Sequence, residues 1–407
     1  MNILIITQLY PQPDDEGANK PTHTVEYFAK EWVKIGHKVV VAHCSSKFPI
    51  VFYFIPSTIK NKLAVKTSNI FPGLKSRRKL IRTEYGIDIY RYPMLKMMPG
   101  YGYSDRTMHN QADQIIKDLE KKHFTPDLIA GHFANPSTEL VAILAQYYNA
   151  KSSIVFHGDC NERNLERYKL AELTKKIGAI GARSKPESEQ IKRLLSMNTT
   201  PFVCCSGAPN DAVSSAETIC KKHDYSKGTH YIWAGSMIRR KNLNEVMKAF
   251  SEAADTEDTL EIIGSGPEES SFRETAEQLN AKHQIHFSGR LPRNEVLAHM
   301  KNAQIFTLIS HHEVFGMVYI EAMLQGCLVI ASKGEGFDGI IIDGVNGFIC
   351  EPGNEKMLAQ IYKRIQKMSI EERNKIGQAA IDTAIHYSER EVAERYLNDI
   401  LSNQGKR

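Results

Sequence analysis

The stretch that organises this chain is ISHHEVFGMVYIEAMLQGCLVIASKGEGFDGIIIDGVNGFICEP, residues 309–352. The apolar run before it ends in polar residues at Ser310, which is typical of a buried strand that stops at a loop. Gly316 then lets the backbone turn, and the apolar residues 317–324 predict a helix that closes at Gly326. At the start of the chain, a strand at 2–7, a helix at 22–35 and a strand at 38–42 form a βαβ unit, which predicts an α/β fold with a doubly wound parallel sheet.

Two glutamates, Glu313 and Glu321, lie around the loop of this stretch. Glu321 is the one charged residue of an apolar helix, and burying a carboxylate without a hydrogen-bond partner costs several kcal/mol. At about 1.5 Å per residue the glutamates lie at most ~12 Å apart along a helix axis, which suits two ends of one ligand. Free amides at the helix N-terminus favour an anion such as a phosphate. The alternative is a solvated Glu313 and a Glu321 that forms a buried ion pair.

The wider pattern extends beyond the two glutamates. Glu313-x-Phe-Gly, then Glu321-Ala-Met, then DGVNGF at residues 343–348, resembles the Glu-x7-Glu signature of retaining nucleotide-sugar glycosyltransferases of family 4. The resemblance is dense in residues 230–353 and sparser in the first 210. It implies the GT-B fold, an α/β architecture in which two Rossmann-like doubly wound domains face a central cleft.

Length and composition are those of a two-domain globular protein. The 407 residues are too many for one ordinary core, and 42% of them are hydrophobic and 24% charged. The net charge of +5 is modest, so we do not expect a nucleic-acid partner. The seven cysteines form no C-x-x-C pair, and their odd number argues against a complete disulfide framework. We therefore expect a cytoplasmic protein.

The sequence predicts no membrane-spanning segment but does predict a membrane-facing surface. Residues 1–10 have no basic region before their apolar run, so they read as a strand rather than a signal peptide. Residues 57–83 contain eight basic side chains and no acidic one, and they follow the apolar run 50–55. This composition is typical of a segment on an anionic membrane surface, so residues 50–83 predict peripheral attachment to the inner face of the cell membrane. The alternative is a solvated basic face beside a core strand.

Strand and helix patterns alternate along the whole chain. In the first half we expect strands at 2–7, 38–42, 87–92, 127–133, 153–158, 177–182 and 202–206, and helices at 22–35, 106–122, 137–147, 162–176 and 186–195. In the second half we expect strands at 230–235, 260–264, 285–289 and 304–309, and helices at 243–254, 269–279, 293–301, 355–368, 371–387 and 389–401. The polar Gly/Pro step at 206–210 predicts a boundary between domains 1–208 and 209–385, and the resemblance implies that 386–407 crosses back to the first domain.

The resemblance implies that two residues of the first domain contact the donor. Gly17 lies in the loop after the first strand, where the backbone would approach the donor diphosphate; an ordinary turn glycine is the alternative. His157 ends a strand at the carboxyl edge of the sheet, where open α/β sheets bind ligands. The resemblance places it close to the donor sugar as a catalytic residue. His132 ends another such strand, and we favour a structural role for it.

A cationic segment follows the strand at 230–235. Cations at a strand end can neutralise a diphosphate, and lysine acts there as a point charge. The family pattern is Gly-Arg-Leu-x-x-x-Lys, so Lys241 matches it, whereas Ser236 stands where arginine is usual. We expect Arg239 or Arg240 to replace that arginine and, together with Lys241, to stabilise the leaving diphosphate. The donor-binding residues expected in this segment are Gly235, Ser236 and Arg239, and the catalytic ones are Arg240 and Lys241.

The resemblance assigns the remaining donor-binding residues. Glu321 would bind the ribose hydroxyls, and Glu313 would contact the donor sugar as a catalytic residue. A glycine-rich turn at Gly264 and a base-reading loop at Arg290 and Leu291 would complete the nucleotide site. The backbone amides expected to hold sugar and phosphate belong to Phe315, Gly316, Met317 and Val318.

These observations predict a retaining glycosyltransferase that moves a hexosyl or N-acetylhexosaminyl group from a UDP- or GDP-sugar to a hydroxyl. We expect a saccharide or lipid-linked acceptor in bacterial cell-surface polysaccharide or glycolipid synthesis, near Tyr101, Tyr103 and Arg106. Without an Asp-x-Asp triplet or His/Cys ligand spacing, no metal or cofactor is implied. Two alternatives stay open: a catalytically silent glycosyltransferase-like subunit, and a nucleotide-sugar epimerase or hydrolase on the same fold.

Overall fold

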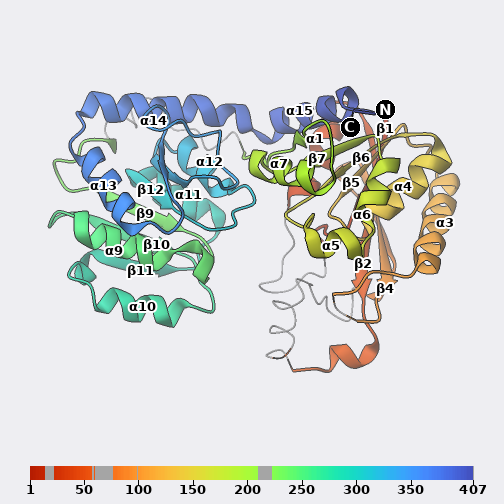
Figure 1. The fold of residues 1–407 in the computed structure, drawn as a ribbon, viewed down its shortest axis with the longest axis horizontal. Coiled ribbons are helices and arrows are strands. Elements are labelled where there is room, and N and C mark those ends of the chain that lie inside the picture. The colour runs from red at the N-terminus through yellow and green to blue at the C-terminus, as the bar shows by residue number, and fades with distance from the viewer. Residues whose placement is uncertain (14–22, 57–58, 60–76, 99, 210–221, 407) are drawn as a thin grey trace. The chain divides into compact units, whose positions relative to one another are not determined.

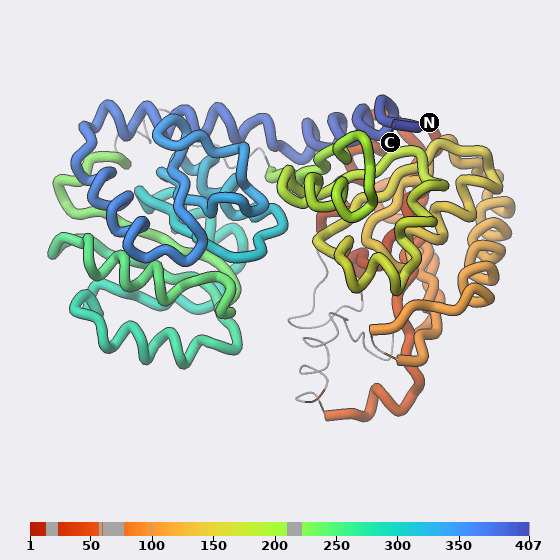
Figure 2. The backbone as a smooth tube through the Cα atoms, viewed as in Figure 1, coloured from red at the N-terminus to blue at the C-terminus, as the bar shows by residue number. Residues whose placement is uncertain are grey.

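The computed structural model describes residues 1–13, 23–56, 59, 77–98, 100–209 and 222–406. The chain divides into two compact units. The first contains Met1–Arg183, Glu187–Cys204 and Val392–Arg407, and the second contains Ser184–Pro186 and Cys205–Glu391. Figure 2 follows the backbone from the first unit into the second and back to the first at its carboxyl-terminal end.

The first unit is built on an eight-stranded sheet with the order β3-β4-β2-β1-β5-β6-β7-β8. Residues Ile3–Ile6 are fully buried whichever way they point, because helices cover both faces of the sheet (Figure 1). All neighbouring strands are parallel except β3 and β4. The strands are β1 (Asn2–Thr7), β2 (Lys38–Lys47), β3 (Leu80–Glu84), β4 (Ile87–Leu95), β5 (Leu128–His132), β6 (Lys151–Val155), β7 (Ala179–Ala182) and β8 (Phe202–Val203).

Strand β3 is absent from the sequence-based prediction, which assigned its residues to the basic segment. It pairs with β4 as an antiparallel hairpin through Tyr85 and Gly86, which have φ of 53° and 76°. Its residues alternate between partly buried and exposed, as expected for an edge strand with one face against the protein. The exposed positions are Ile81 and Thr83, and the basic Arg82 lies on the partly buried face. The alternation was missed because a basic side chain occupies a position on the buried face, where an apolar residue is expected.

The helices of the first unit follow the predicted pattern with one correction. The expected helix 162–176 is interrupted at Lys169, whose φ of 51° ends the α-helical hydrogen bonding. The helical elements are α1 (Thr24–Lys34), η2 (Ile50–Tyr53), α3 (Asp105–Lys121), α4 (Ser137–Tyr148), α5 (Glu162–Arg167), α6 (Leu170–Leu173), η4 (Thr174–Lys176), α7 (Lys185–Leu194) and α15 (Glu389–Ser402).

The second unit has a six-stranded, fully parallel sheet with the order β11-β10-β9-β12-β13-β14. Its strands are β9 (His230–Ala234), β10 (Thr259–Ile263), β11 (Ile285–Gly289), β12 (Ile305–Leu308), β13 (Leu328–Ser332) and β14 (Phe348–Cys350). Its helices are η6 (Arg239–Lys241), α9 (Leu243–Ala253), α10 (Glu269–Glu277), η7 (Lys282–Gln284), α11 (Arg293–Asn302), α12 (Met317–Leu324), α13 (Glu355–Gln366), α14 (Ile370–Ala384) and η8 (Ile385–Tyr387).

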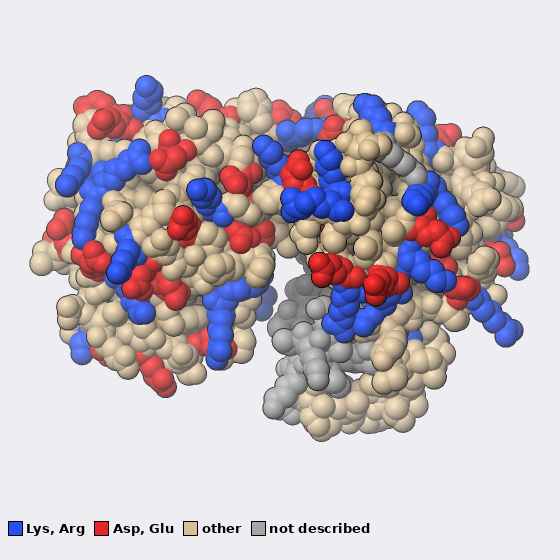
Figure 3. Space-filling view, viewed as in Figure 1, with Lys and Arg blue, Asp and Glu red and all other residues tan. Residues whose placement is uncertain are grey.

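These two units confirm the α/β class with two doubly wound domains. Among the helices that the structure describes, none is both long and apolar enough to cross a lipid bilayer. Acidic and basic side chains are interspersed over both units on the face shown in Figure 3. Six of the seven cysteines are described, and each is buried.

Candidate active site

The strand order of the second sheet reverses between β9 and β12, which lie side by side. Open α/β sheets bind ligands at such a reversal, outside the carboxyl ends of the strands. The chain leaving β9 continues into η6, and the chain leaving β12 continues into residues 309–316. The topology therefore brings the cationic segment and the glutamate loop, which are about 70 residues apart in sequence, to the same edge.

Lys241 and Glu313 meet at this edge. The Lys241 ammonium donates a hydrogen bond to Glu313 Oε2, and each side chain is only 11% exposed. Asn242 follows Lys241 with a φ of 51°, and its Nδ2 donates to the Ile309 carbonyl over 2.6 Å, which ties the two segments together. Burial lowers the pKa of Lys241, although the Glu313 carboxylate opposes that shift.

The backbone of Glu313 is held by a loop between β13 and β14. The Glu313 amide donates to Glu335 Oε2 over 2.8 Å, and the Glu313 carbonyl accepts from the Gly336 amide over 2.8 Å. These two bonds fix the direction of the Glu313 side chain. Sequence reasoning did not assign Glu335 to the site; its only signal was a Glu-Gly step between two apolar strands.

The two arginines before Lys241 point to different partners. Arg240 Nη1 donates to the carbonyls of His312, over 3.1 Å, and His311, over 3.4 Å, so it lies against the loop that carries Glu313. The Arg239 side chain is 88% exposed and pairs with Glu268 over 3.3 Å. Ser236 is exposed. Of the two candidates for the missing arginine, Arg240 is the one beside Glu313.

The helix α12 begins at Gly316, which has a φ of 83°. A Cβ at this position would overlap the Tyr319 ring, whose hydroxyl donates to the Leu308 carbonyl over 2.7 Å. Phe315 turns inward and packs edge-on against Phe337, with a distance of 5.8 Å between the ring centroids. Met317 and Val318 stay half-buried. The first backbone amides of α12, which no residue of the helix can satisfy, therefore lie next to Glu313.

Glu321 forms an ion pair with Arg293 at the start of α11. Arg293 Nε lies 2.6 Å from Glu321 Oε1, and the two side chains are 44% and 12% exposed respectively. Burial raises the pKa of Glu321, whereas the Arg293 guanidinium lowers it. The buried ion pair left open by the sequence is thus present in this structure. Arg293 itself was missed, because nothing in the sequence connects the start of α11 with the middle of α12.

The loops after β9, β10 and β11 pack backbone against backbone. The Gly264 amide donates to the Gly289 carbonyl over 2.8 Å, and a Cβ on Gly264 would overlap the Gly235 carbonyl. Gly264 has a φ of 146°, which favours glycine. Arg290 is exposed and Leu291 is half-exposed on the third loop. The sequence-predicted nucleotide residues Gly235, Gly264, Arg290 and Leu291 therefore gather on neighbouring loops.

In the first unit, His157 follows β6 and is partly exposed. Its ring stacks on Phe133, with 4.0 Å between the ring centroids, and its Nε2 lies 3.1 Å from Nδ1 of His132. Burial and the nearby Arg183 lower the pKa of His157, so the ring is neutral at pH 7. His132 is fully buried, as expected for the structural role that the sequence favoured.

Two carboxylates hold the loop that carries His157. Asp159 accepts the backbone amides of His157, over 2.9 Å, and Ala134. Glu187 on α7 accepts those of Gly158 and Arg183, over 2.7 Å to the latter. Burial raises the pKa of Glu187 to about 7 even though both hydrogen bonds favour its charged form. The sequence did not single out either carboxylate.

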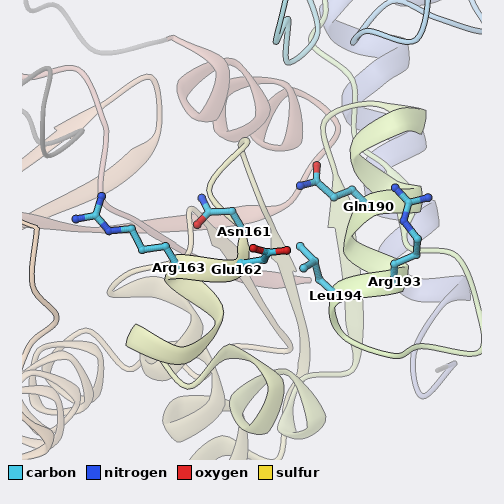
Figure 4. Close-up of a pocket in the computed structure, with 6 residues that line it drawn as sticks. All are labelled: Asn161, Glu162, Arg163, Gln190, Arg193 and Leu194. Carbon is cyan, nitrogen blue, oxygen red and sulfur yellow. The ribbon is translucent and has the colours of Figure 1, made fainter.

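A hollow of about 660 Å³ adjoins this loop, between the start of α5 and helix α7 (Figure 4). Glu187 and Gln190 are three residues apart on α7, so the helix that holds the His157 loop also lines the hollow. In Figure 4, Glu162 points toward Leu194, and the two arginine side chains extend away from each other. The lining residues are Asn161, Glu162, Arg163, Gln190, Arg193 and Leu194.

Exposed apolar side chains gather in the segments at the carboxyl ends of β2 and β4. The Lys96 amide donates to the Lys47 carbonyl over 2.8 Å, so the segments after these two strands start side by side. We call the residues they expose the apolar plate. Charged side chains are sparse over the short helix η2 on the face shown in Figure 3. The apolar plate consists of Ile50, Val51, Phe54, Leu95, Met97, Met98 and Tyr101, each at least 46% exposed.

Some predicted features lie outside the described residues. Gly17 is one, and residues 57–58 and 60–76 of the basic segment are others. Of the basic residues that are described, Arg78 is exposed, Arg77 stacks on Tyr53, and Lys79 pairs with Asp118 over 2.5 Å. Within the described part of the chain, no three His, Cys, Asp or Glu side chains converge in a way that could hold a metal ion.

The sequence of this chain is similar to those of known glycosyltransferases. Residues 216–383 match the model of the family described as glycosyl transferases group 1. The chain is 23% identical over 384 residues to a putative teichuronic acid biosynthesis glycosyltransferase, TuaC, of Bacillus subtilis, with 91% of this chain and 90% of TuaC covered.

Two solved structures match the whole chain. One is Anabaena HepE in complex with UDP, with a TM-score of 0.68, 15% identity and coverage of 99% of this chain and 100% of that one. The other is the lipopolysaccharide outer core galactosyltransferase WaaB, with a TM-score of 0.70, 14% identity and 99% coverage of both chains. The full-length matches confirm the predicted GT-B fold.

Proposed function

The chain belongs to the group 1 glycosyltransferases, and from that premise we propose that it uses a UDP-sugar donor and glycosylates a hydroxyl of a cell-surface saccharide. As a retaining enzyme of family 4, it keeps the configuration of the anomeric carbon. Two relatives support the choice of donor and acceptor. HepE has been solved with UDP and with UDP-glucose, and TuaC is assigned to teichuronic acid biosynthesis.

The observation that carries the proposal is the Lys241–Glu313 pair beside the first amides of α12. A diphosphate that leaves the sugar accumulates negative charge, and a buried ammonium stabilises that charge more strongly than an exposed one. Arg240 adds a second cation on the same loop. Glu313 is then the carboxylate that faces the sugar, while the amides of Phe315 to Val318 bind phosphate and sugar oxygens.

Glu321 is the proposed ribose ligand, lying one turn or more along α12 from those amides. A carboxylate accepts hydrogen bonds from two neighbouring hydroxyls, as a ribose presents. For this role its ion pair with Arg293 must open or shift, and the exposed end of Arg293 makes such a movement inexpensive. Arg290 and Leu291 on the loop after β11 would contact the base.

In the first unit we propose that His157 contacts the donor sugar and that the acceptor saccharide binds in the hollow beside its loop. The hollow offers the carboxamides of Asn161 and Gln190 and a carboxylate, Glu162, which together suit sugar hydroxyls. Leu194 supplies an apolar patch of the kind on which a sugar ring packs. Arg163 and Arg193 at its borders favour an acceptor that carries negative charge.

We also propose that the protein attaches peripherally to an anionic membrane through the apolar plate. No acidic residue occurs between positions 32 and 83 or between 89 and 104, so the chain around the plate is purely basic or neutral. Apolar side chains can enter the headgroup region while nearby cations attract anionic lipids, each contributing on the order of 1 kcal/mol. A lipid-linked acceptor would be reached from this position.

A donor screen followed by product analysis tests the function. We expect UDP-sugars to raise the melting temperature of the purified protein, and GDP- and ADP-sugars not to, since a ligand at 100 times its Kd adds about 2.7 kcal/mol. The stabilising donor, supplied with a bacterial lipid-linked saccharide, should yield UDP and an α- or β-linked product of the same anomeric configuration as the donor. Stabilisation by GDP-sugars alone, or formation of free or epimerised sugar in place of a glycoside, would overturn the proposal.

A further inference from the structure

Two buried side chains and a partly exposed one form a hydrogen-bonded row in the first unit. The Tyr396 hydroxyl lies 3.3 Å from Nε2 of His132, and Nδ1 of His132 lies 3.1 Å from Nε2 of His157. Both nitrogens of the His132 ring are therefore engaged, one on each side. The row connects α15, near the carboxyl terminus, with the partly exposed His157 in the loop after β6.

The ends of this row are held rigidly. Tyr396 packs against Phe28, with 4.9 Å between ring centroids, and against Trp32, with 5.3 Å. The Trp32 indole donates to the Ala393 carbonyl, one turn earlier on α15, over 3.0 Å. At the other end, His157 stacks on Phe133. None of the rings can turn without disrupting aromatic packing, so the spacing of the row is a fixed property of the unit.

All three groups are neutral at physiological pH. Burial lowers the pKa of His132 to about 3 and lowers that of His157 as well, with Arg183 adding to both shifts. Burial raises the pKa of Tyr396 well above its ordinary value. Each imidazole therefore carries one hydrogen on one of its two nitrogens, and the phenol keeps its own.

With these hydrogens only two arrangements satisfy both contacts. In the first, Tyr396 donates to Nε2 of His132, and Nδ1–H of His132 donates to Nε2 of His157. In the second, every donor and acceptor is reversed, and the phenolic hydrogen of Tyr396 needs another acceptor. The Ser153 hydroxyl is the other polar group beside the Tyr396 hydroxyl. Among the described residues it forms no hydrogen bond of good geometry, so it is a poor acceptor for that hydrogen. An unsatisfied buried donor costs about 1–3 kcal/mol, which favours the first arrangement.

We propose that Tyr396 and His132 are positioning residues that lock His157 in the tautomer with its hydrogen on Nδ1. Nε2 of His157 accepts from His132, so Nδ1–H is the group left for a ligand, and His157 meets the donor sugar as a hydrogen-bond donor. This inference rests on the proposed contact between His157 and the donor sugar. It extends that proposal by stating which ring nitrogen acts and what holds it.

The lock has a chemical use at such a site. A neutral N–H donates to a sugar hydroxyl without adding a full positive charge near an anomeric carbon that itself becomes positive in the transition state. A histidine free to exchange tautomers would present a bare nitrogen for part of the time. The row removes that alternative by fixing the hydrogen from a residue on the last helix.

Nitrogen-15 NMR of histidine-labelled protein tests the tautomer directly. The signals of His132 and His157 are assigned from the spectra of His132→Gln and His157→Gln. In the wild-type protein we expect a protonated Nδ1 and an unprotonated Nε2 for His157, and the same for His132. A protonated Nε2 on His157, or rapid exchange between both forms, in the wild-type protein would overturn the proposal.

Tyr396→Phe then tests the origin of the lock. Tyr148 provides a matched control, because its hydroxyl is also buried but has no hydrogen-bond partner among the described residues. We expect Tyr396→Phe to lose the fixed tautomer of His157 and to lower kcat roughly tenfold with a smaller change in the donor KM, the size expected for one misplaced hydrogen bond. Tyr148→Phe should change neither. An unchanged His157 spectrum in Tyr396→Phe would refute the role of Tyr396.

The two proposals fail in different ways. If the protein transferred no sugar while His157 kept its hydrogen on Nδ1 in the wild type and lost that preference in Tyr396→Phe, the proposed function would fall and the tautomer lock would stand. If transfer were measured with His157 protonated on Nε2, the lock would fall and the function would stand.

Discussion

The Lys241 ammonium and the Glu313 carboxylate are hydrogen-bonded to each other, and each side chain is about nine-tenths buried. The two residues come from the ends of neighbouring strands, β9 and β12, at the point where the strand order reverses. Each charge compensates the other in a place where neither could stay buried alone. Folding thus places a cation and a carboxylate side by side, as the proposed function requires.

Replacing Lys241 by Met should lower both the catalytic rate and the stability of the protein, and the two effects can be measured separately. We expect kcat to fall by about 10²–10³, because the leaving diphosphate loses a buried cation. We also expect a loss of about 3–5 kcal/mol in the free energy of unfolding, because Glu313 remains buried without its partner. Steady-state kinetics and urea unfolding of the second unit measure the two effects.

The double variant Lys241→Met/Glu313→Gln should recover much of the stability and none of the activity. Lys248→Met is a suitable control, since Lys248 and Glu355 form a pair that is about half exposed and 3.5 Å apart. Near-normal turnover of Lys241→Met would show that Lys241 does not serve the leaving group.

Arg293→Met should make donor binding more sensitive to acid. Burial raises the pKa of Glu321 and Arg293 opposes that rise, so removing Arg293 leaves the carboxyl protonated up to a higher pH. The charged form is the better acceptor for ribose hydroxyls, so the donor KM of the variant should begin to increase at a higher pH than that of the wild type as the pH falls. Donor KM measured from pH 8 to pH 5 tests this. If the donor KM of the variant and of the wild type rose over the same pH range, Glu321 would not be the ribose ligand.

Gly316→Ala should be more harmful than a substitution at another glycine with the same backbone. Gly316 and Gly334 have φ of 83° and 71°, so alanine costs about 1 kcal/mol at either position. A Cβ at Gly316 would also overlap the Tyr319 ring, whereas nothing lies within 4 Å of a Cβ at Gly334. We expect Gly316→Ala to be clearly less stable than Gly334→Ala in thermal unfolding and to lose donor binding. Equal losses of stability in the two variants would mean that the backbone at the start of α12 can move to accommodate the added Cβ.

Glu187 should make the first unit less stable as the pH rises. Its pKa is about 7 in the folded protein against 4.5 ordinarily, so between these values the folded state holds more protons than the unfolded state. The free energy of unfolding therefore falls as the pH rises through this window, by up to about 3 kcal/mol, and levels off above it. Glu187→Gln cannot titrate, so the stability of the wild type relative to this variant should decline from pH 5 to pH 7. A constant difference would contradict the raised pKa.

The apolar plate can be tested with lipid vesicles. We expect Phe54→Ser/Met97→Ser to weaken sedimentation with anionic liposomes, because both side chains are at least two-thirds exposed. Arg78→Glu should weaken it as well, whereas Lys79 is already paired with Asp118 and is a poorer probe. Val345→Ser, an exposed apolar site in the second unit, serves as the control. Binding that survives both changes, or that is equal on zwitterionic vesicles, would remove the membrane proposal.

The periodicity of the chain was sufficient to predict the α/β class and most of the helices and strands, because strand and helix patterns depend on nearby residues. Where the prediction was wrong, a local exception prevailed. The backbone at Lys169 breaks one helix, and the hairpin that forms β3 was hidden among basic residues. The residues of the glutamate stretch were likewise proposed as site residues from local pattern alone.

The partners of those residues depended on tertiary structure. Lys241 meets Glu313 across 72 positions, Arg293 meets Glu321 across 28, and Tyr396 meets His132 across 264. Such contacts follow from the order of strands in each sheet and from the docking of the last helix. Neither of these can be predicted from the local hydrophobic periodicity of the sequence. The sequence by itself determined which side chains are available for chemistry, and only the folded chain decided which of them share a hydrogen bond.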